Sequence, residues 1–237
     1  ATDALDRLHT TACSHERIMV LEVMGRHAGW IALHSGIAGG GDVILLPEIP
    51  WSYEHVCDAM LEREQSGKKI TLVVVAEWPQ LHDGGTVEHE RRQENRQTRL
   101  GGIGNVVAYE IEQRLRRETR TVVLGHLQRG GPPTTFDRVL ATQFGAHAVR
   151  LIVEKRFGEM VCYHPPHINS VPILEAVNEL STVDAKGSAV MAARALGISF
   201  GDLPASASPF LDVESYGDVC VETLDDESEL VESLTHV

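Results

Sequence analysis

Residues 17–26 read Arg17-Ile18-Met19-Val20-Leu21-Glu22-Val23-Met24-Gly25-Arg26, and this stretch decides the fold. Its apolar run is short, carries a single acidic residue and stops at Gly25. Such a run is typical of a strand that is buried on both faces of a sheet. Strands of this kind occur in parallel sheets covered by helices, so the stretch predicts an α/β protein.

Three further apolar runs repeat the pattern along the chain, at Asp42–Leu46, Ile70–Ala76 and Thr119–Leu124. Segments with helical character lie between and after them. These are His27–Ile37, Ser52–Gln65, Gly104–Arg116, Thr134–Glu154, and two shorter ones near Pro172–Glu179 and Asp184–Leu196. The alternation predicts a Rossmann-like, three-layer α/β fold, with helices on both faces of a parallel sheet.

The composition excludes several classes of protein. The chain has 237 residues, enough for one large domain, and 43% of them are hydrophobic. No stretch approaches 18 consecutive apolar residues, and the first residues lack the basic and apolar regions of a signal peptide. The four cysteines form no CxxC pair, which favours free thiols in a reducing compartment. We therefore expect a cytoplasmic protein with no membrane span.

The net charge of −13 is concentrated at the C-terminal end. Ten of the 34 acidic residues lie in residues 202–237, which contain none of the 21 basic ones. Residues 1–201 are therefore close to neutral. An acidic balance argues against binding to nucleic acid. The acidic tail at 202–237 is interpreted as a solubilising, partly disordered segment, or alternatively as a docking segment for a basic partner.

Polar side chains directly follow the predicted strands. They are Arg26 after the first, Glu48 after Pro47, Glu77 after the third and His126 after the fourth. Ligands of doubly wound sheets bind outside the carboxyl ends of the strands. We expect four arginines to lie on or next to these strand ends, Arg17, Arg26, Arg120 and Arg129. Guanidinium groups bind phosphate through paired hydrogen bonds, so the pattern predicts a site for a phosphorylated sugar or a nucleotide. The alternative for any single arginine is a solvated surface charge.

Two long segments make a specific family resemblance. Residues Ser14 to Trp30 resemble the first long signature of the 6-phosphofructokinases, and Leu124 to Arg138 resemble the second. Residues 99–104 and 117–120 look like the subgroup that includes both ATP-dependent and pyrophosphate-dependent members. The resemblance covers residues 1–201, which we expect to form the sugar-phosphate-binding region of the phosphofructokinase fold.

The resemblance implies roles for individual residues. Met24, Gly25 and Arg26 look like the trio that contacts fructose 6-phosphate and the transferring phosphoryl group, with Arg26 as the catalytic residue. Glu77 looks like the carboxylate that holds the sugar hydroxyls, and His126 and Arg129 like the pair that grips the sugar phosphate. Arg17 and Arg120 look like the pair that reaches across from a neighbouring subunit, which implies a homodimer or homotetramer. Gly40, Asp42 and Lys68 fall where some members bind a nucleotide effector.

The part of the family's site that binds the phosphoryl donor has no counterpart in the 237 residues. No glycine-rich loop precedes residue 17, and no Thr-Ile-Asp-Asn-Asp segment occurs. We therefore interpret the chain as the C-terminal part of a glycolytic kinase, with the N-terminal half absent. Such a kinase phosphorylates fructose 6-phosphate to fructose 1,6-bisphosphate with ATP or pyrophosphate. Mg²⁺ would bind mainly through that half, and we expect no metal ligands here. The chain alone is expected to be inactive and to expose apolar surface on its last helices.

Two other function classes stay open. One is a non-catalytic module that binds a sugar phosphate or a nucleotide and acts through its acidic tail. The other is an oxidoreductase of the Rossmann type, which lacks support because the glycine fingerprint and its acidic partner are missing. Cys162, His164 and His167 have the residue types of a zinc site, but no fourth ligand is near, and the sequence favours a plain loop there.

Overall fold

The computed structural model describes residues 1–15, 17–77, 102–178 and 180–203. The charged segment that begins at Trp78 and nearly all of the acidic tail lie outside the described residues. The interpretation of that tail therefore stays a prediction.

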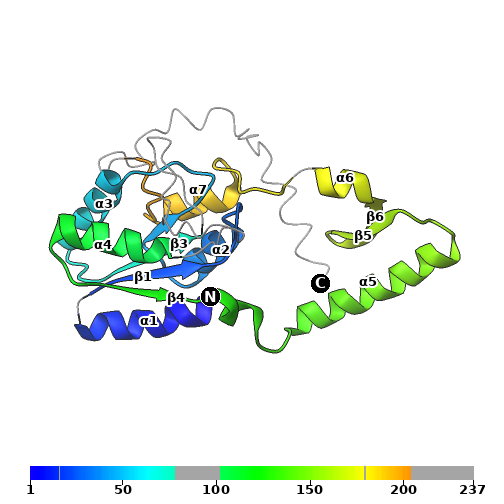
Figure 1. Ribbon diagram of the computed structural model, residues 1–237, viewed down its shortest axis with the longest axis horizontal. Helices are drawn as coiled ribbons and strands as arrows, with labels where there is room; N and C mark the ends of the chain where they lie inside the picture. The colour runs from blue at the N-terminus through cyan, green and yellow to red at the C-terminus, as the bar shows by residue number, and fades with distance from the viewer. Residues whose placement is uncertain (16, 78–101, 179, 204–237) are drawn as a thin grey trace, which may run out of the picture. The chain divides into compact units, whose positions relative to one another are not determined.

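Four parallel strands form the central sheet in the order β2-β3-β1-β4 (Figure 1). Val23 at the end of β1 pairs with Ala76 at the end of β3. On the other side of β1, Glu22 pairs with Val123 of β4. The three strands therefore end at the same edge. The strands are β1 (Ile18–Val23), β2 (Val43–Leu45), β3 (Thr71–Ala76) and β4 (Thr119–Val123).

Helices cover both faces of this sheet, as the sequence predicts. One face packs against α1 (Thr2–His15), α2 (Trp30–Ala38) and α7 (Ser188–Ala195), and the other against α3 (Tyr53–Gln65) and α4 (Ile103–Leu115). Alternate residues of β1 supply the two cores: Met19 and Leu21 face the first group, whereas Ile18 and Val20 face the second. The three-layer α/β fold is confirmed.

Local sequence signals explain where several helices begin. Ser52 caps α3, since its side-chain oxygen accepts a hydrogen bond from the His55 backbone N–H at 3.1 Å. Thr134 and Asp137 form a reciprocal capping box at the start of α5 (Thr135–Val153). Hydrogen bonds from Thr134 lower the pKa of the Asp137 carboxyl. The helix α1 was not predicted from the sequence.

Glu22 is a buried carboxylate in the middle of β1, with only 2% of its surface exposed. Its oxygens accept hydrogen bonds from the backbone N–H groups of Gly102 and Gly104, each at 2.8 Å. Both groups belong to the unpaired N–H groups at the start of α4. Glu22 therefore joins the central strand to α4, and the negative charge lies at the positive end of that helix.

A second group of elements follows β4. It comprises the 3₁₀ turn η1 (Gly125–Arg129), α5, the strands β5 (Glu159–His164) and β6 (His167–Pro172), and α6 (Ile173–Asn178). The strands pair antiparallel as a hairpin, and α5 packs against them. The sequence-based expectation of a plain loop around Cys162 and His167 was wrong, because both residues belong to strands.

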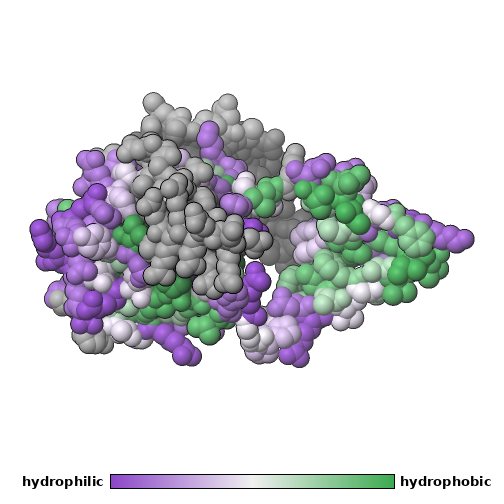
Figure 2. Space-filling model, in the orientation of Figure 1, coloured by the Kyte–Doolittle hydropathy of each residue, from purple (hydrophilic) through white to green (hydrophobic). Residues whose placement is uncertain are grey.

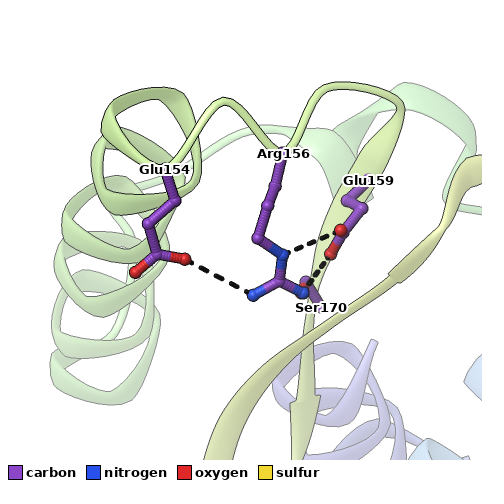
Figure 3. Close-up of polar contacts among 4 residues, drawn as sticks. All are labelled: Glu154, Arg156, Glu159 and Ser170. Atoms are coloured by element: carbon purple, nitrogen blue, oxygen red, sulfur yellow. Dashed lines mark hydrogen bonds and ion pairs between the residues drawn. The ribbon is translucent and has the colours of Figure 1, made fainter.

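Arg156 ties the hairpin to the end of α5 (Figure 3). Its Nε donates to Glu159 Oε1 at 2.8 Å, and its Nη2 donates to Ser170 Oγ at 2.8 Å. A third contact pairs it with Glu154 at 3.6 Å. The hydrogen bonds from Arg156 lower the pKa of the Glu159 carboxyl. The guanidinium is thus already shared between two carboxylates.

Apolar side chains lie exposed on α5 and α6, as the sequence predicts (Figure 2). Within α5 only Leu151 is buried. Val153 and Leu174 are 76% and 75% exposed. The expectation is not met by α7, which buries Val190 and Ala193 in the core. Exposed apolar surface of this extent is unusual for a soluble monomeric protein.

The three described cysteines are all free thiols, as expected: Cys13 is exposed, Cys57 buried and Cys162 half-buried. Burial raises the pKa of the Cys57 thiol. Within the described residues, no helix is both long and apolar enough to cross a membrane.

Candidate functional site

Met24, Glu77 and Leu124 follow β1, β3 and β4 at the carboxyl edge of the sheet. This edge contains the topological switch point of the fold, where neighbouring strands connect to helices on opposite faces. β1 and β3 are neighbours, yet the next described helices, α2 and α4, pack on opposite faces of the sheet. Helices that diverge in this way leave a crevice between the two strand ends. Met24 and Glu77 therefore flank the predicted ligand position.

A tight turn after β1 presents Arg26. The Ala28 backbone N–H donates to the Gly25 carbonyl oxygen at 3.1 Å and closes the turn. A Cβ on Gly25 would lie 2.5 Å from the Ala28 carbonyl oxygen, so this position requires glycine. Arg26 itself has a φ of 56°, a conformation that few non-glycine residues adopt. The backbone at Arg26 is strained, and such strain concentrates at functional sites.

Two carboxylates from neighbouring strands hold this turn. Glu77 Oε2 accepts a hydrogen bond from the Arg26 backbone N–H at 3.1 Å. Glu48 Oε1 accepts one from the Gly29 backbone N–H at 2.9 Å. The side chain of Arg26 is exposed beside the half-buried Glu77. Glu77 therefore holds the backbone of the turn, and the exposed side chain of Arg26 forms no ion pair with a described carboxylate.

The short helix η1 adds an arginine and a histidine at the same edge. The Leu124 backbone N–H donates to the Glu22 carbonyl oxygen at 3.1 Å, which extends the pairing of β4 with β1 by one residue. Gly125, with a φ of 48°, then turns the chain into η1. His126 and Arg129 are both exposed on η1.

Within the part of the chain that the structure describes, the arginines at this edge have no carboxylate partner. Among the described residues, no acidic side chain forms an ion pair with Arg26, His126 or Arg129. Uncompensated guanidinium groups beside a switch point suit an anionic ligand that binds through paired hydrogen bonds. Glu77 adds an acceptor that suits hydroxyl groups. The edge therefore has side chains suited to an anionic ligand that carries hydroxyl groups.

Arg17 and Arg120 do not lie at this edge, so the expected clustering of four arginines within one chain was wrong. Arg17 directly precedes β1, and Arg120 pairs with Met19 near the start of the strands. At about 3.3 Å per residue, β1 separates them from Met24 by roughly 20 Å. The prediction grouped residues near the starts of strands, Arg17 and Arg120, with residues that follow the ends of strands. In a parallel sheet these two groups lie at opposite edges.

Arg17 and Arg120 nevertheless form a pair. Both bind Glu118: Arg17 Nε donates to Oε2 at 2.8 Å, and Arg120 Nη2 donates to Oε1. One carboxylate thus holds two guanidinium groups together at the amino edge of β1 and β4. The pair carries a net positive charge and is partly exposed, with 31% of Arg17 and 56% of Arg120 accessible. That it serves a neighbouring subunit stays a prediction.

Asp42 is one of the three residues that the resemblance places at an effector site. Its carboxylate is occupied by contacts within the fold. Its Oδ2 accepts a hydrogen bond from the Leu72 backbone N–H at 2.8 Å, and its Oδ1 pairs with Arg63. Burial is the main cause that raises the pKa of the Asp42 carboxyl. The structure therefore gives this carboxylate a role between β2 and α3.

The described residues offer no metal site, because they contain no group of three or more His, Cys, Asp or Glu side chains suited to a metal ion. Mg²⁺ prefers several oxygen ligands, and Glu77 is committed to the Arg26 backbone.

Sequence reasoning missed the roles of three carboxylates: Glu22, Glu48 and Glu118. For Glu22 a signal exists, because a single acidic residue within a buried strand needs buried donors. Glu48 follows a strand end, which placed it near the site without assigning a partner. Glu118 carries no signal of its own, since its contact with Arg17 spans 101 residues of the chain.

Comparisons with known proteins identify the family of the chain. A profile of the family described as Phosphofructokinase matches residues 1–152. The ATP-dependent 6-phosphofructokinase of Chloroflexus aurantiacus is 50% identical over 202 residues, which are 85% of this chain and 55% of that protein. The pyrophosphate–fructose 6-phosphate 1-phosphotransferase of Streptomyces coelicolor is 51% identical over 185 residues, 78% of this chain and 54% of that protein.

Solved structures agree as well. The phosphofructokinase of Saccharomyces cerevisiae superposes with a TM-score of 0.64 and 33% sequence identity, over 74% of this chain and 22% of that one. The chain spans about half the length of the curated relatives it matches. With a family profile covering more than half of its residues, and the family's fold around the cationic edge, the chain belongs to the phosphofructokinase family.

Proposed function

We propose that this chain supplies the fructose 6-phosphate side of a 6-phosphofructokinase. The reaction transfers a phosphoryl group from ATP or pyrophosphate to the sugar. The observation that carries the proposal is the carboxyl edge, where Arg26, His126 and Arg129 have no carboxylate partner among the described residues. A sugar phosphate supplies the missing negative charge.

Different side chains contact different parts of the ligand. Arg129 and His126 take the 6-phosphate, because both are exposed on the same short helix and both can donate hydrogen bonds to phosphate oxygens. Glu77 keeps one oxygen for the sugar hydroxyls, while its other oxygen holds the Arg26 backbone. Met24 lines the crevice. Arg26 faces the phosphoryl group in transfer and stabilises the charge that spreads over its oxygens in the transition state.

A second copy of the chain completes the site. Arg17 and Arg120, held together by Glu118, present a positive charge that this copy's own edge does not use. Placed against the carboxyl edge of a partner, they add two guanidinium groups to the 6-phosphate. This arrangement predicts a homodimer or homotetramer in the cytoplasm.

The donor nucleotide or pyrophosphate, with its Mg²⁺, binds residues other than the described ones. The exposed apolar side chains of α5 and α6 are the surface against which that donor-binding polypeptide packs. The 237 residues alone are therefore expected to bind the sugar phosphate without turning it over.

A titration of the ¹⁵N-labelled chain with fructose 6-phosphate tests the proposal. Amide resonances of residues 24–26, of Glu77 and of η1 should shift together and saturate, because these groups surround the ligand. Unphosphorylated fructose serves as the control and should shift none of them at the same concentrations. Shifts confined to the β5–β6 hairpin, or none at all, would contradict the proposal.

A further inference from the structure

Glu48 lies just after β2 and accepts backbone hydrogen bonds from two distant segments. Its Oε1 is 2.9 Å from the Gly29 backbone nitrogen and 2.8 Å from that of Val183, and its Oε2 is 3.2 Å from the Gly29 nitrogen. Val183 is almost fully buried, with 4% of its surface exposed. One carboxylate thus joins the start of α2 to the segment that leads into α7.

The surroundings of Gly29 are shaped around this carboxylate. A Cβ at Gly29 would lie 2.7 Å from Leu46 Cδ2 and 2.8 Å from Glu48 Oε2, so only glycine permits the approach. Gly29 is also the N-cap of α2, where a negative charge is favoured by the helix dipole. A second hydrogen bond joins the same two segments: Trp30 Nε1 donates to the Ser181 carbonyl oxygen at 2.9 Å.

From these contacts we infer that Glu48 is a positioning residue for Arg26. Only two residues separate Arg26 from Gly29, and the hydrogen bond from the Ala28 backbone N–H to the Gly25 carbonyl oxygen closes the turn that contains Arg26. Arg26 keeps its positive φ only while its surroundings hold it. Glu77 holds the turn at Arg26, and Glu48 holds it at Gly29. With either anchor released, the guanidinium loses its fixed direction.

The consequence for binding rests on the proposed function and is selective. Arg26 belongs to the turn that Glu48 anchors. His126 and Arg129 lie on η1, with which Glu48 forms no hydrogen bond among the described residues. In the proposed function the sugar contacts Met24 and Glu77, and Glu77 is bonded to this same turn. Loss of Glu48 should therefore weaken a ligand that contacts the turn and leave a ligand held only by η1 unaffected. Fructose 6-phosphate and inorganic phosphate are the two probes.

The test compares Glu48→Ala and Glu48→Gln with Glu62→Gln, an exposed glutamate on α3. Calorimetry measures the Kd of each probe, and amide hydrogen exchange measures protection at Arg26, Ala28, Gly29 and Val183. Glu48→Ala should weaken fructose 6-phosphate about tenfold and leave phosphate within about twofold. Glu48→Gln, which retains Oε1, should fall between wild type and Glu48→Ala, and Glu62→Gln should match wild type.

Exchange separates this inference from the proposed function. Faster exchange at Arg26 and Ala28, as well as at Gly29 and Val183, supports a positioning role even if the wild-type chain binds no fructose 6-phosphate. In that case only the proposed function fails. Exchange that rises at Gly29 and Val183 alone, or an equal loss of both probes, makes Glu48 a local cap and overturns the inference. If Glu48→Ala does not fold, the exchange pattern of Glu48→Gln decides.

Discussion

Replacing Arg129 by alanine is expected to weaken the binding of fructose 6-phosphate by roughly 10- to 100-fold. A hydrogen bond between charged groups contributes about 1.5–3 kcal/mol, and each 1.4 kcal/mol is about tenfold in Kd. Arg129 is exposed and has no ion-pair partner among the described residues, so its removal should leave the midpoint of thermal unfolding unchanged. Calorimetric titration measures the loss.

Two further variants make the result interpretable. Arg150→Ala removes an exposed arginine from the last turn of α5 and should bind as tightly as wild type. Arg129→Lys keeps the charge but loses the paired hydrogen bonds, so its Kd should fall between those of wild type and Arg129→Ala. An equal loss in Arg150→Ala and Arg129→Ala would mean that bulk charge, and not η1, attracts the ligand.

Replacing Glu22 by alanine is expected to lower the free energy of unfolding by about 3 kcal/mol, because two buried N–H groups at the start of α4 lose their acceptor. A single domain of ordinary stability has only about 5–15 kcal/mol in total. Urea denaturation measures the change through the transition midpoint.

The neutral isostere and a surface glutamate serve as controls. Glu22→Gln keeps one acceptor oxygen and should lose less stability than Glu22→Ala. Glu62→Ala changes an exposed position of α3 and should stay within about 0.5 kcal/mol of wild type. If Glu22→Ala is no less stable than Glu62→Ala, the carboxylate does not hold α4 to the sheet.

The sheet and its carboxyl edge are predictable from the sequence for a physical reason. Buried parallel strands need apolar residues on both faces, so β1 and β3 stand out as unbroken runs. Because such strands end together, Arg26, Glu77 and His126 follow as neighbours, and the structure brings them to one edge. The two signature segments add the family, since each is long and lies in the family's order.

The remaining features depend on register and tertiary contact, which a single sequence does not encode locally. Arg120 lies beside Met19 only because β4 pairs with β1 in one register, and this places it away from Arg129. The donors of Glu22 are about eighty residues away along the chain. The β5–β6 hairpin was missed because Pro165 and Pro166 at its tip are typical of a loop.

The most direct measurement of the central claim is a complementation assay. This chain is mixed with the amino-terminal part of the Chloroflexus aurantiacus relative that lies outside the matched region, and formation of fructose 1,6-bisphosphate is followed with ATP and with pyrophosphate. We predict product from the mixture with one of the two donors, none from either polypeptide alone, and loss of product with Arg129→Ala. Clear turnover by this chain alone, or a mixture that associates on sedimentation yet forms no product, would contradict the claim.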